Sequence, residues 1–263
     1  MIRINEVLME EINKRCSRRK FSEEQITAEE EAEILRIVEE INDDSDLELE
    51  GNINYGEEVF DGFKASYGLI RGCSSYVALI GDSREESIEE KIGYYGEYLV
   101  LKLTQMGFGT CWVGGTYDKK AVEKDIKTEY CDKIYCVIAL GNLEQEEKSG
   151  FEKVIGFFGR NRKSMEELLI NIDEIKKEER EWILQGVESV RKAPSALNSQ
   201  PWLFSYDGDN IFIRTNGKKT GFEKIDMGIA MLHFQMGAEY AGCKGQWKFI
   251  ENDWKFIKLT GER

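Results

Sequence analysis

The sequence predicts an α+β fold made of two related halves, residues 1–174 and 175–263, packed as one unit. Two observations predict it: helical patterns and short strands follow one another in both halves, and glycine and tryptophan recur at a constant spacing. At 263 residues, the chain is long enough for one large domain or two compact halves.

Each element of the first half follows from its residue pattern. Thr27 and Glu30 form a capping box, which predicts a helix whose apolar face is Ile34, Leu35, Val38 and Ile41. The full set of expected elements is a helix at 3–14, a helix from 27 to about 41, an exposed acidic loop at 42–58, a strand at 76–80, a helix at 92–106 ended by Gly107, a polar helix at 118–127, a strand at 134–140 and a connector at 142–174.

The second half has a similar succession of patterns. Two short apolar runs on either side of an Asp-Gly-Asp-Asn turn predict a hairpin. The expected elements are a helix around 182–190, strands at 202–206 and 211–214, a helix at 226–241 stopped by Gly242, and one or two strands within 246–259.

The halves are interpreted as degenerate copies of each other. An offset of 135 residues aligns Gly93 with Gly228, Gly107 with Gly242, and Trp112 with Trp247. The earlier helices align better at 149, as Ile34-Leu35 with Ile183-Leu184, so we expect the first half to carry a 14-residue insertion in its acidic loop. The alternative is that short apolar helices align easily by chance.

Composition excludes several functions. A net charge of −14 argues against a nucleic-acid or anionic-membrane binder, since both require a positive surface. The single histidine, His233, excludes multi-histidine metal sites, and we expect no metal; it is interpreted as a hydrogen-bonded core or half-buried residue. Six cysteines without a CxxC pair, and the lack of a signal peptide or an apolar run of about 18 residues, predict a cytoplasmic protein.

A basic cluster near the N-terminus is unusual in so acidic a chain. Its members are Lys14, Arg15, Ser17, Arg18, Arg19 and Lys20. The simpler interpretation is a solvated turn. The alternative is an anion site, because guanidinium forks and a hydroxyl suit a phosphate, and positions 15, 17 and 19 of an extended segment share a face. A second cluster, Arg160, Arg162 and Lys163, could close the same site.

Both prolines of the chain, Pro194 and Pro201, lie in one short segment. They restrict the backbone there, and Ser195, Asn198 and Gln200 stand between them. One interpretation is a rigid turn from helix to strand. The other is a binding segment whose three hydrogen-bonding side chains contact a flat polar ligand.

The third feature is the glycine-rich run from Gly107 to Gly115, in which the backbone can approach a ligand closely. Trp112 occupies the third glycine position of a dinucleotide fingerprint, so a Rossmann site is not supported. Cys111 is interpreted as a packing residue, and no motif of a hydrolase is present.

Together these features resemble the nitroreductase family of flavin enzymes. The family's Arg-x-Ser-x-Arg/Lys motif corresponds to Arg15, Ser17 and Arg19, with Phe21 following, and its Pro-Ser-x-x-Asn-x-Gln-Pro-Trp motif to Pro194–Trp202 without a mismatch. Each motif occurs here in a different half, which resembles the fused single-chain branch. The resemblance implies a mostly antiparallel central sheet flanked by helices, with two repeats forming an intramolecular pseudo-dimer.

The resemblance also implies a function and a site. The activity is FMN-dependent, NAD(P)H-driven two-electron reduction of an electron-poor acceptor, such as a nitroaromatic or a quinone, by a ping-pong mechanism. Arg19 acts electrostatically at the flavin, and a monomer binds one FMN and a small-molecule substrate. The implied cofactor-binding residues are Arg15, Ser17, Arg19, Trp112, Val113, Gly114, Gly115, Arg160, Arg162, Pro194, Ser195, Asn198 and Gln200.

Two alternatives remain on the same fold. One is a non-catalytic flavin-binding protein, a store or a sensor, and the other is a scaffold that has lost FMN. Gly114 also departs from the family, because members often have glutamate there, so contacts through that side chain are not expected.

Overall fold

The computed structural model describes residues 6–61, 70–144, 161–217 and 219–259. These residues divide into two compact units, one within Lys14–Lys153 and the other within Ile4–Asn13 and Val154–Arg263. Most of helix α1 (Glu6–Lys14) therefore belongs to the second unit, and the structural division falls before the boundary expected at residue 174.

The first unit is built on a four-stranded antiparallel sheet of order β1-β2-β4-β3. Its strands are β1 (Glu50–Asn52), β2 (Ser75–Asp82), β3 (Gly109–Val113) and β4 (Asp132–Gly141). Its helices are α2 (Ala28–Ser45), α3 (Glu57–Phe60), α5 (Ile88–Gln105) and α6 (Lys119–Asp125).

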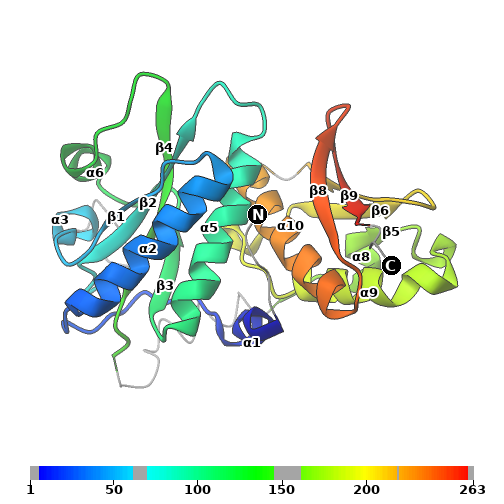
Figure 1. Cartoon of the computed structure of the whole chain (residues 1–263), viewed down its shortest axis with the longest axis horizontal. Helices are drawn as coiled ribbons and strands as arrows, with labels where there is room; N and C mark the ends of the chain where they lie inside the picture. Colours follow the sequence, from blue (N-terminus) through cyan, green and yellow to red (C-terminus); the bar gives the residue numbers. More distant parts are fainter. Residues whose placement is uncertain (1–5, 62–69, 145–160, 218, 260–263) are drawn as a thin grey trace. The chain divides into compact units, whose positions relative to one another are not determined.

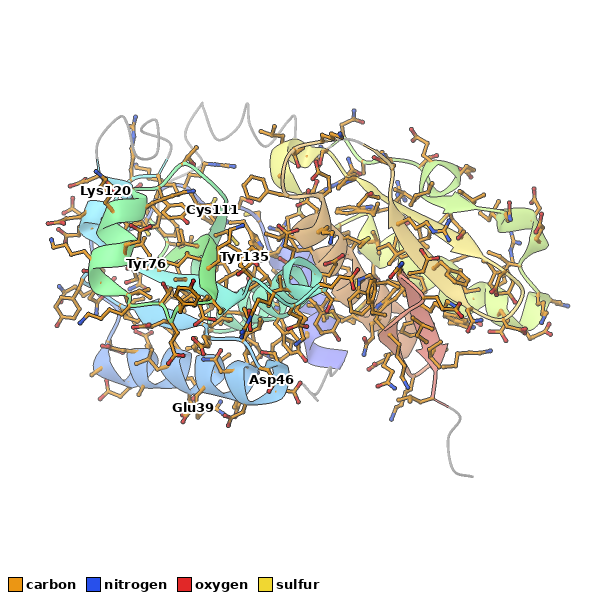
Figure 2. All side chains as sticks on the ribbon, turned by 90° about the horizontal axis from the view of Figure 1, so that it is seen from above. Glu39, Asp46, Tyr76, Cys111, Lys120 and Tyr135 are labelled. Carbon is orange, nitrogen blue, oxygen red and sulfur yellow. The ribbon has the colours of Figure 1, made fainter. Side chains whose placement is uncertain are left out.

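Helices cover both faces of this sheet, which explains why strand β2 is an almost continuous buried apolar run. Helices α2 and α5 lie side by side, and α5 packs on the sheet (Figure 1). Alternate residues of β2, from Tyr76 to Ile80, join a core cluster with α3 and α6. Figure 2 shows Glu39 on the side of α2 away from the sheet.

The expected capping box is confirmed, because the Thr27 hydroxyl accepts from the amide of Glu30 and the Glu30 carboxylate accepts from the amide of Thr27. The prediction of an exposed acidic loop at 42–58 is wrong. Helix α2 continues to Ser45, where the Asn42 side chain bonds both backbone groups of Leu49, and β1 and α3 follow. The expected core residue Leu35 is exposed, and Ile37 is buried instead.

The second unit holds a five-stranded sheet of order β5-β6-β7-β9-β8, antiparallel except for the β5–β6 pair. Its strands are β5 (Leu169–Ile170), β6 (Trp202–Tyr206), β7 (Ile211–Thr215), β8 (Gly245–Ile250) and β9 (Asp253–Lys258). Its further helices are α8 (Met165–Leu168), α9 (Lys177–Val190) and α10 (Glu223–Tyr240), with 3₁₀ turns η1 (Ile172–Glu174) and η2 (Ala196–Asn198).

Two glycines let helices α9 and α10 approach closely (Figure 1). A Cβ atom on Gly237 would lie 2.9 Å from the Cα of Gly186. His233 is buried at this contact, and its Nδ1 lies 3.1 Å from the Ser189 carbonyl oxygen, which confirms the core interpretation. Aromatic rings, among them Phe234 and Trp247, fill the space between helices and sheet.

The two units share one order of elements. If the short helices α3, α6 and α8, the 3₁₀ turns and strand β5 are set aside, each runs helix, strand, strand, helix, strand, strand, and these four strands stand in the same order in their sheets, β1-β2-β4-β3 and β6-β7-β9-β8. Helices α5 and α10 start and end at the offset of 135 expected from the sequence. The connection between β1 and β2, residues 53–74, is longer than that between β6 and β7, residues 207–210, and it overlaps the end of the expected acidic loop.

No helix among the described residues is long and apolar enough to cross a bilayer.

Candidate functional site

The basic segment after α1 is extended and lies along strand β3. Ser17 forms a parallel bridge with Thr110, and the amide of Arg18 donates to the Thr110 carbonyl at 2.8 Å. Further along, the amide of Arg71 donates to the Arg19 carbonyl at 2.8 Å. The structure therefore brings the expected phosphate-binding segment next to the glycine-rich run, within the first unit.

Arg15 faces a carboxylate in the interior of this unit. Its Nε lies 3.6 Å from Oε1 of Glu97 on α5, and the side chains are 8% and 0% exposed. The other oxygen of Glu97 accepts from the indole of Trp112 at 2.9 Å. The buried carboxylate of Glu97 thus joins two residues that are distant in the sequence, Arg15 and Trp112, and the sequence analysis missed Glu97.

The charges of Arg19 and Arg15 both act on Cys111 of strand β3. Burial raises the pKa of the Cys111 thiol, and the charges of Arg19 and Arg15 act in the opposite direction. The Arg18 side chain points elsewhere, against Gly109. Cys111 itself, labelled in Figure 2, belongs to the core cluster of the first unit, which agrees with a packing role.

The glycine-rich run divides into two parts. Gly109–Val113 is strand β3, which the sequence analysis did not expect, and Gly114 and Gly115 follow it. A Cβ atom built on Gly115 would have open space around it, with no atom of the described residues within 4 Å. The backbone of Gly115 is therefore accessible to a ligand.

In the second unit, the segment between the prolines is connected to the second basic cluster. Nη1 of Arg162 donates to the Ala193 carbonyl at 2.8 Å and to Oδ1 of Asn198 at 3.1 Å. Nζ of Lys163 donates to the Gln200 carbonyl at 2.8 Å. Arg160 lies outside the described residues.

The side chains of Asn198 and Gln200 serve the turn itself. Each donates to the Asn161 carbonyl at 3.0 Å, and the Gln200 side-chain oxygen accepts from the amide of Lys163 at 3.0 Å. The Ser195 hydroxyl accepts from the amide of Gln200 at 3.0 Å. The rigid-turn interpretation therefore describes these side chains well, and a contact of theirs with a ligand stays a prediction.

The backbone of this turn is strained. Leu197, Asn198 and Gln200 have φ angles of 53°, 53° and 46°, in the left-handed region that L-residues other than asparagine and aspartate rarely adopt. Leu197 is also 92% exposed, so little packing compensates for its conformation. Strain of this kind persists only where the surroundings impose it, and it is concentrated at functional sites.

A buried carboxylate from the next helix contributes to holding the turn. Asp226, in the first turn of α10, accepts from the amide of Ala196 at 3.0 and 3.2 Å. Burial raises its pKa to about 7, against the effect of the bond from Ala196. Sequence analysis missed Asp226, because it stands at the first position of the helix predicted at 226–241, where an acidic residue is ordinary.

The predicted residues thus form two groups, each within its own unit. The first contains Arg15, Ser17, Arg19, Trp112, Val113, Gly114 and Gly115, and the second contains Arg162, Pro194, Ser195, Asn198 and Gln200. Among the residues that the structure describes, no group of histidine, cysteine and carboxylate side chains could hold a metal ion.

Comparison with known proteins identifies the family. Residues 7–238 match the sequence model of the family described as "Putative TM nitroreductase", so the chain belongs to this nitroreductase family, one of oxidoreductases. No curated protein matches the sequence.

The solved structures show the fold. A "putative nitroreductase" from Thermotoga maritima is 22% identical over 98% of this chain and 95% of that one, with a TM-score of 0.63. The predicted α+β nitroreductase-like fold is therefore confirmed, with its strands divided between two sheets.

Two shorter proteins are also similar to part of this chain. An FMN-dependent nitroreductase from Clostridium difficile is 19% identical over 53% of this chain and 89% of its own, with a TM-score of 0.42. A nitroreductase with bound FMN from Bacteroides fragilis is 19% identical over 55% and 94%, with a TM-score of 0.42.

The strain at Leu197 predicts a stabilising substitution. Asparagine tolerates the left-handed conformation better than leucine, and an exposed leucine contributes little apolar burial. We expect Leu197→Asn to raise the free energy of unfolding by ~0.5–1 kcal/mol in urea titrations. Leu203→Asn, on a strand with negative φ, is the control and should destabilise. A loss of stability in Leu197→Asn would show that the leucine is packed.

Proposed function

We propose that the chain is an FMN-dependent oxidoreductase that uses NADH or NADPH to reduce an electron-poor small molecule, such as a nitroaromatic or a quinone. The observation that supports the proposal concerns the side chain of Arg15. Its buried Nε has no hydrogen-bond partner among the described residues, although its charge is balanced by Glu97. A buried donor of this kind requires an acceptor.

The residues around Arg15 fit a phosphorylated flavin. Ser17 and Arg19 provide a hydroxyl and a second guanidinium on the same extended segment, which suits an anion. The open space at Gly115 admits a ligand close to the backbone of the glycine-rich run. By resemblance to the family, Arg15, Ser17, Arg160 and Arg162 hold the phosphate.

FMN, when bound, would supply the redox chemistry, a two-electron transfer from NAD(P)H to the acceptor in a ping-pong cycle. Arg19 provides a fixed positive charge that stabilises negative charge near it. The backbone from Trp112 to Gly115 would line the edge of the flavin where substrates react. Pro194 and Ser195 would cover the flavin ring, and Asn198 and Gln200 would contribute by shaping the turn.

We further propose that the chain arose by internal duplication and works as a cytoplasmic monomer with one FMN. The shared strand order of the two units supports duplication. The presence of each family motif in only one half supports a single site per chain, because one complete pair of motifs is available.

A non-catalytic flavin-binding protein is the competing proposal, and turnover separates the two. We expect the purified yellow protein, mixed with NADH or NADPH under nitrogen, to lose its flavin absorbance and to regain it when a quinone is added. Persistent yellow colour with both donors would contradict the enzyme and favour a flavin store or sensor.

Arg15→Ala tests the phosphate site. It removes charge-assisted hydrogen bonds worth about 1.5–3 kcal/mol, so FMN affinity measured by fluorescence quenching should fall at least about tenfold. The affinity for riboflavin, which lacks the phosphate, should fall much less. The double variant Arg15→Ala/Glu97→Gln avoids leaving a buried carboxylate unpaired.

Arg18→Ala is the matched control, because that side chain packs against Gly109 and not toward Glu97. It should leave FMN affinity near the wild-type value. Equal losses in the Arg15 and Arg18 variants, or no loss in either, would place the phosphate elsewhere.

A further inference from the structure

Asp226 contacts the strained turn at two places. Asp226 lies in the first turn of α10 and is only 3% exposed. The carboxylate accepts from the amide of Ala196 through both oxygens, at 3.0 and 3.2 Å, and lies 3.5 Å from the Ser199 hydroxyl. Ala196 directly precedes Leu197, and Ser199 stands between the two other left-handed residues, Asn198 and Gln200.

These contacts secure the turn from one helix. The amide of Ala196 can be bonded by Asp226 only while the turn keeps its present shape, so the bond favours the left-handed backbone that follows it. Arg162 and Lys163 bond other atoms of the turn, namely Oδ1 of Asn198 and main-chain carbonyls. The turn is thus held by an acceptor from α10 and by donors from the segment before α8.

The charge state of Asp226 is responsive near neutral pH. Burial raises its pKa to about 7, the Ala196 and Ser199 donors oppose the shift, and the charge of Glu223, one turn earlier, adds to it. The turn itself presents an amide and a hydroxyl to this carboxyl. The ionised form accepts from both donors through charge-assisted hydrogen bonds, whereas the neutral form is a weaker acceptor and carries a proton that needs an acceptor of its own.

We propose that Asp226 is a positioning residue for the flavin: its carboxylate holds the turn at 196–200 in the shape that covers the ring, and its protonation loosens that turn. The proposal rests on the proposed function, because it assumes that the turn contacts FMN. It adds a residue outside the motif, and a pH dependence of binding, to that function.

The test measures binding of riboflavin and of FMN by fluorescence quenching. Riboflavin has no phosphate to titrate, so its pH dependence reports the protein. We expect wild-type affinity for riboflavin to rise about fivefold from about pH 5.5 to about pH 8.5, equivalent to ~1 kcal/mol. Asp226→Asn, which cannot ionise, should bind with nearly constant affinity over the same range.

Glu239→Gln is the matched control. Glu239 lies at the other end of α10, 13 residues and about 20 Å along the helix, and burial raises the pKa of its carboxyl as well. This variant should keep the wild-type pH dependence. If Glu239→Gln lost the pH dependence as fully as Asp226→Asn does, the dependence would not be specific to Asp226 and the proposal would fail.

Unfolding provides a readout without flavin. Because the pKa of Asp226 is about 7 when folded and near 3.8 when unfolded, the folded state holds the extra proton between these values. The contribution of Asp226 to stability is full below about pH 4 and is lost as the pH rises through about 7. Asp226→Asn should flatten this part of the stability profile, and an unchanged profile would overturn the assignment.

The outcomes separate the two claims. If wild-type protein binds neither flavin, the proposed function fails and this inference fails with it. If flavin binds and Asp226→Asn keeps the wild-type pH dependence, only the inference fails. Should Asp226→Asn not fold, Ser199→Ala removes a donor that favours the ionised form, so the midpoint should move to higher pH. An unmoved midpoint would overturn the proposal.

Discussion

A buried helical carboxylate organises the candidate site residues in each unit. Glu97 on α5 accepts from Trp112 and pairs with Arg15, and Asp226 on α10 accepts from the turn at Ala196. A buried charge is costly unless hydrogen bonds or an opposite charge satisfy it, so each carboxylate selects a conformation in which its donors are in place. Segments that would otherwise be ordinary loops are thereby fixed.

The two carboxylates work with different partners. Glu97 balances the charge of the Arg15 guanidinium, whose buried Nε lies 3.6 Å from Oε1 and has no hydrogen-bond partner among the described residues. Asp226 has backbone and hydroxyl donors, and burial holds its pKa near neutrality. The first arrangement favours a permanent anion site. The second favours a turn whose shape depends on pH.

Local sequence signals predicted much of the fold. The capping box of Thr27 and Glu30, the hairpin turn before β7 and the helix ended by Gly242 all depend on neighbouring residues, and each is found in the structure. The acidic loop was mistaken because its buried residues, Leu47 and Leu49, are separated by charged ones, and tertiary packing determines their burial. Strand β3 was missed because its glycine and threonine suggest a loop.

Only those residues of the candidate site that belong to a sequence motif could be predicted. Arg15 and the Pro194–Trp202 segment were recognisable from residue type and spacing. Glu97 and Asp226 were not, because each acts through contacts with residues 82 and 30 positions away, and no local pattern encodes such a pairing. For the same reason, the sequence could not show that the side chains of Asn198 and Gln200 form hydrogen bonds with the segment before α8.

The central claim is that one chain, with one copy of each motif, builds a single flavin site. Sedimentation velocity recorded at protein and flavin wavelengths tests it most directly. The account predicts that flavin absorbance sediments with a species of 30.3 kDa at one flavin per chain. A stable dimer as the flavin-binding species, or two flavins per chain, would contradict it.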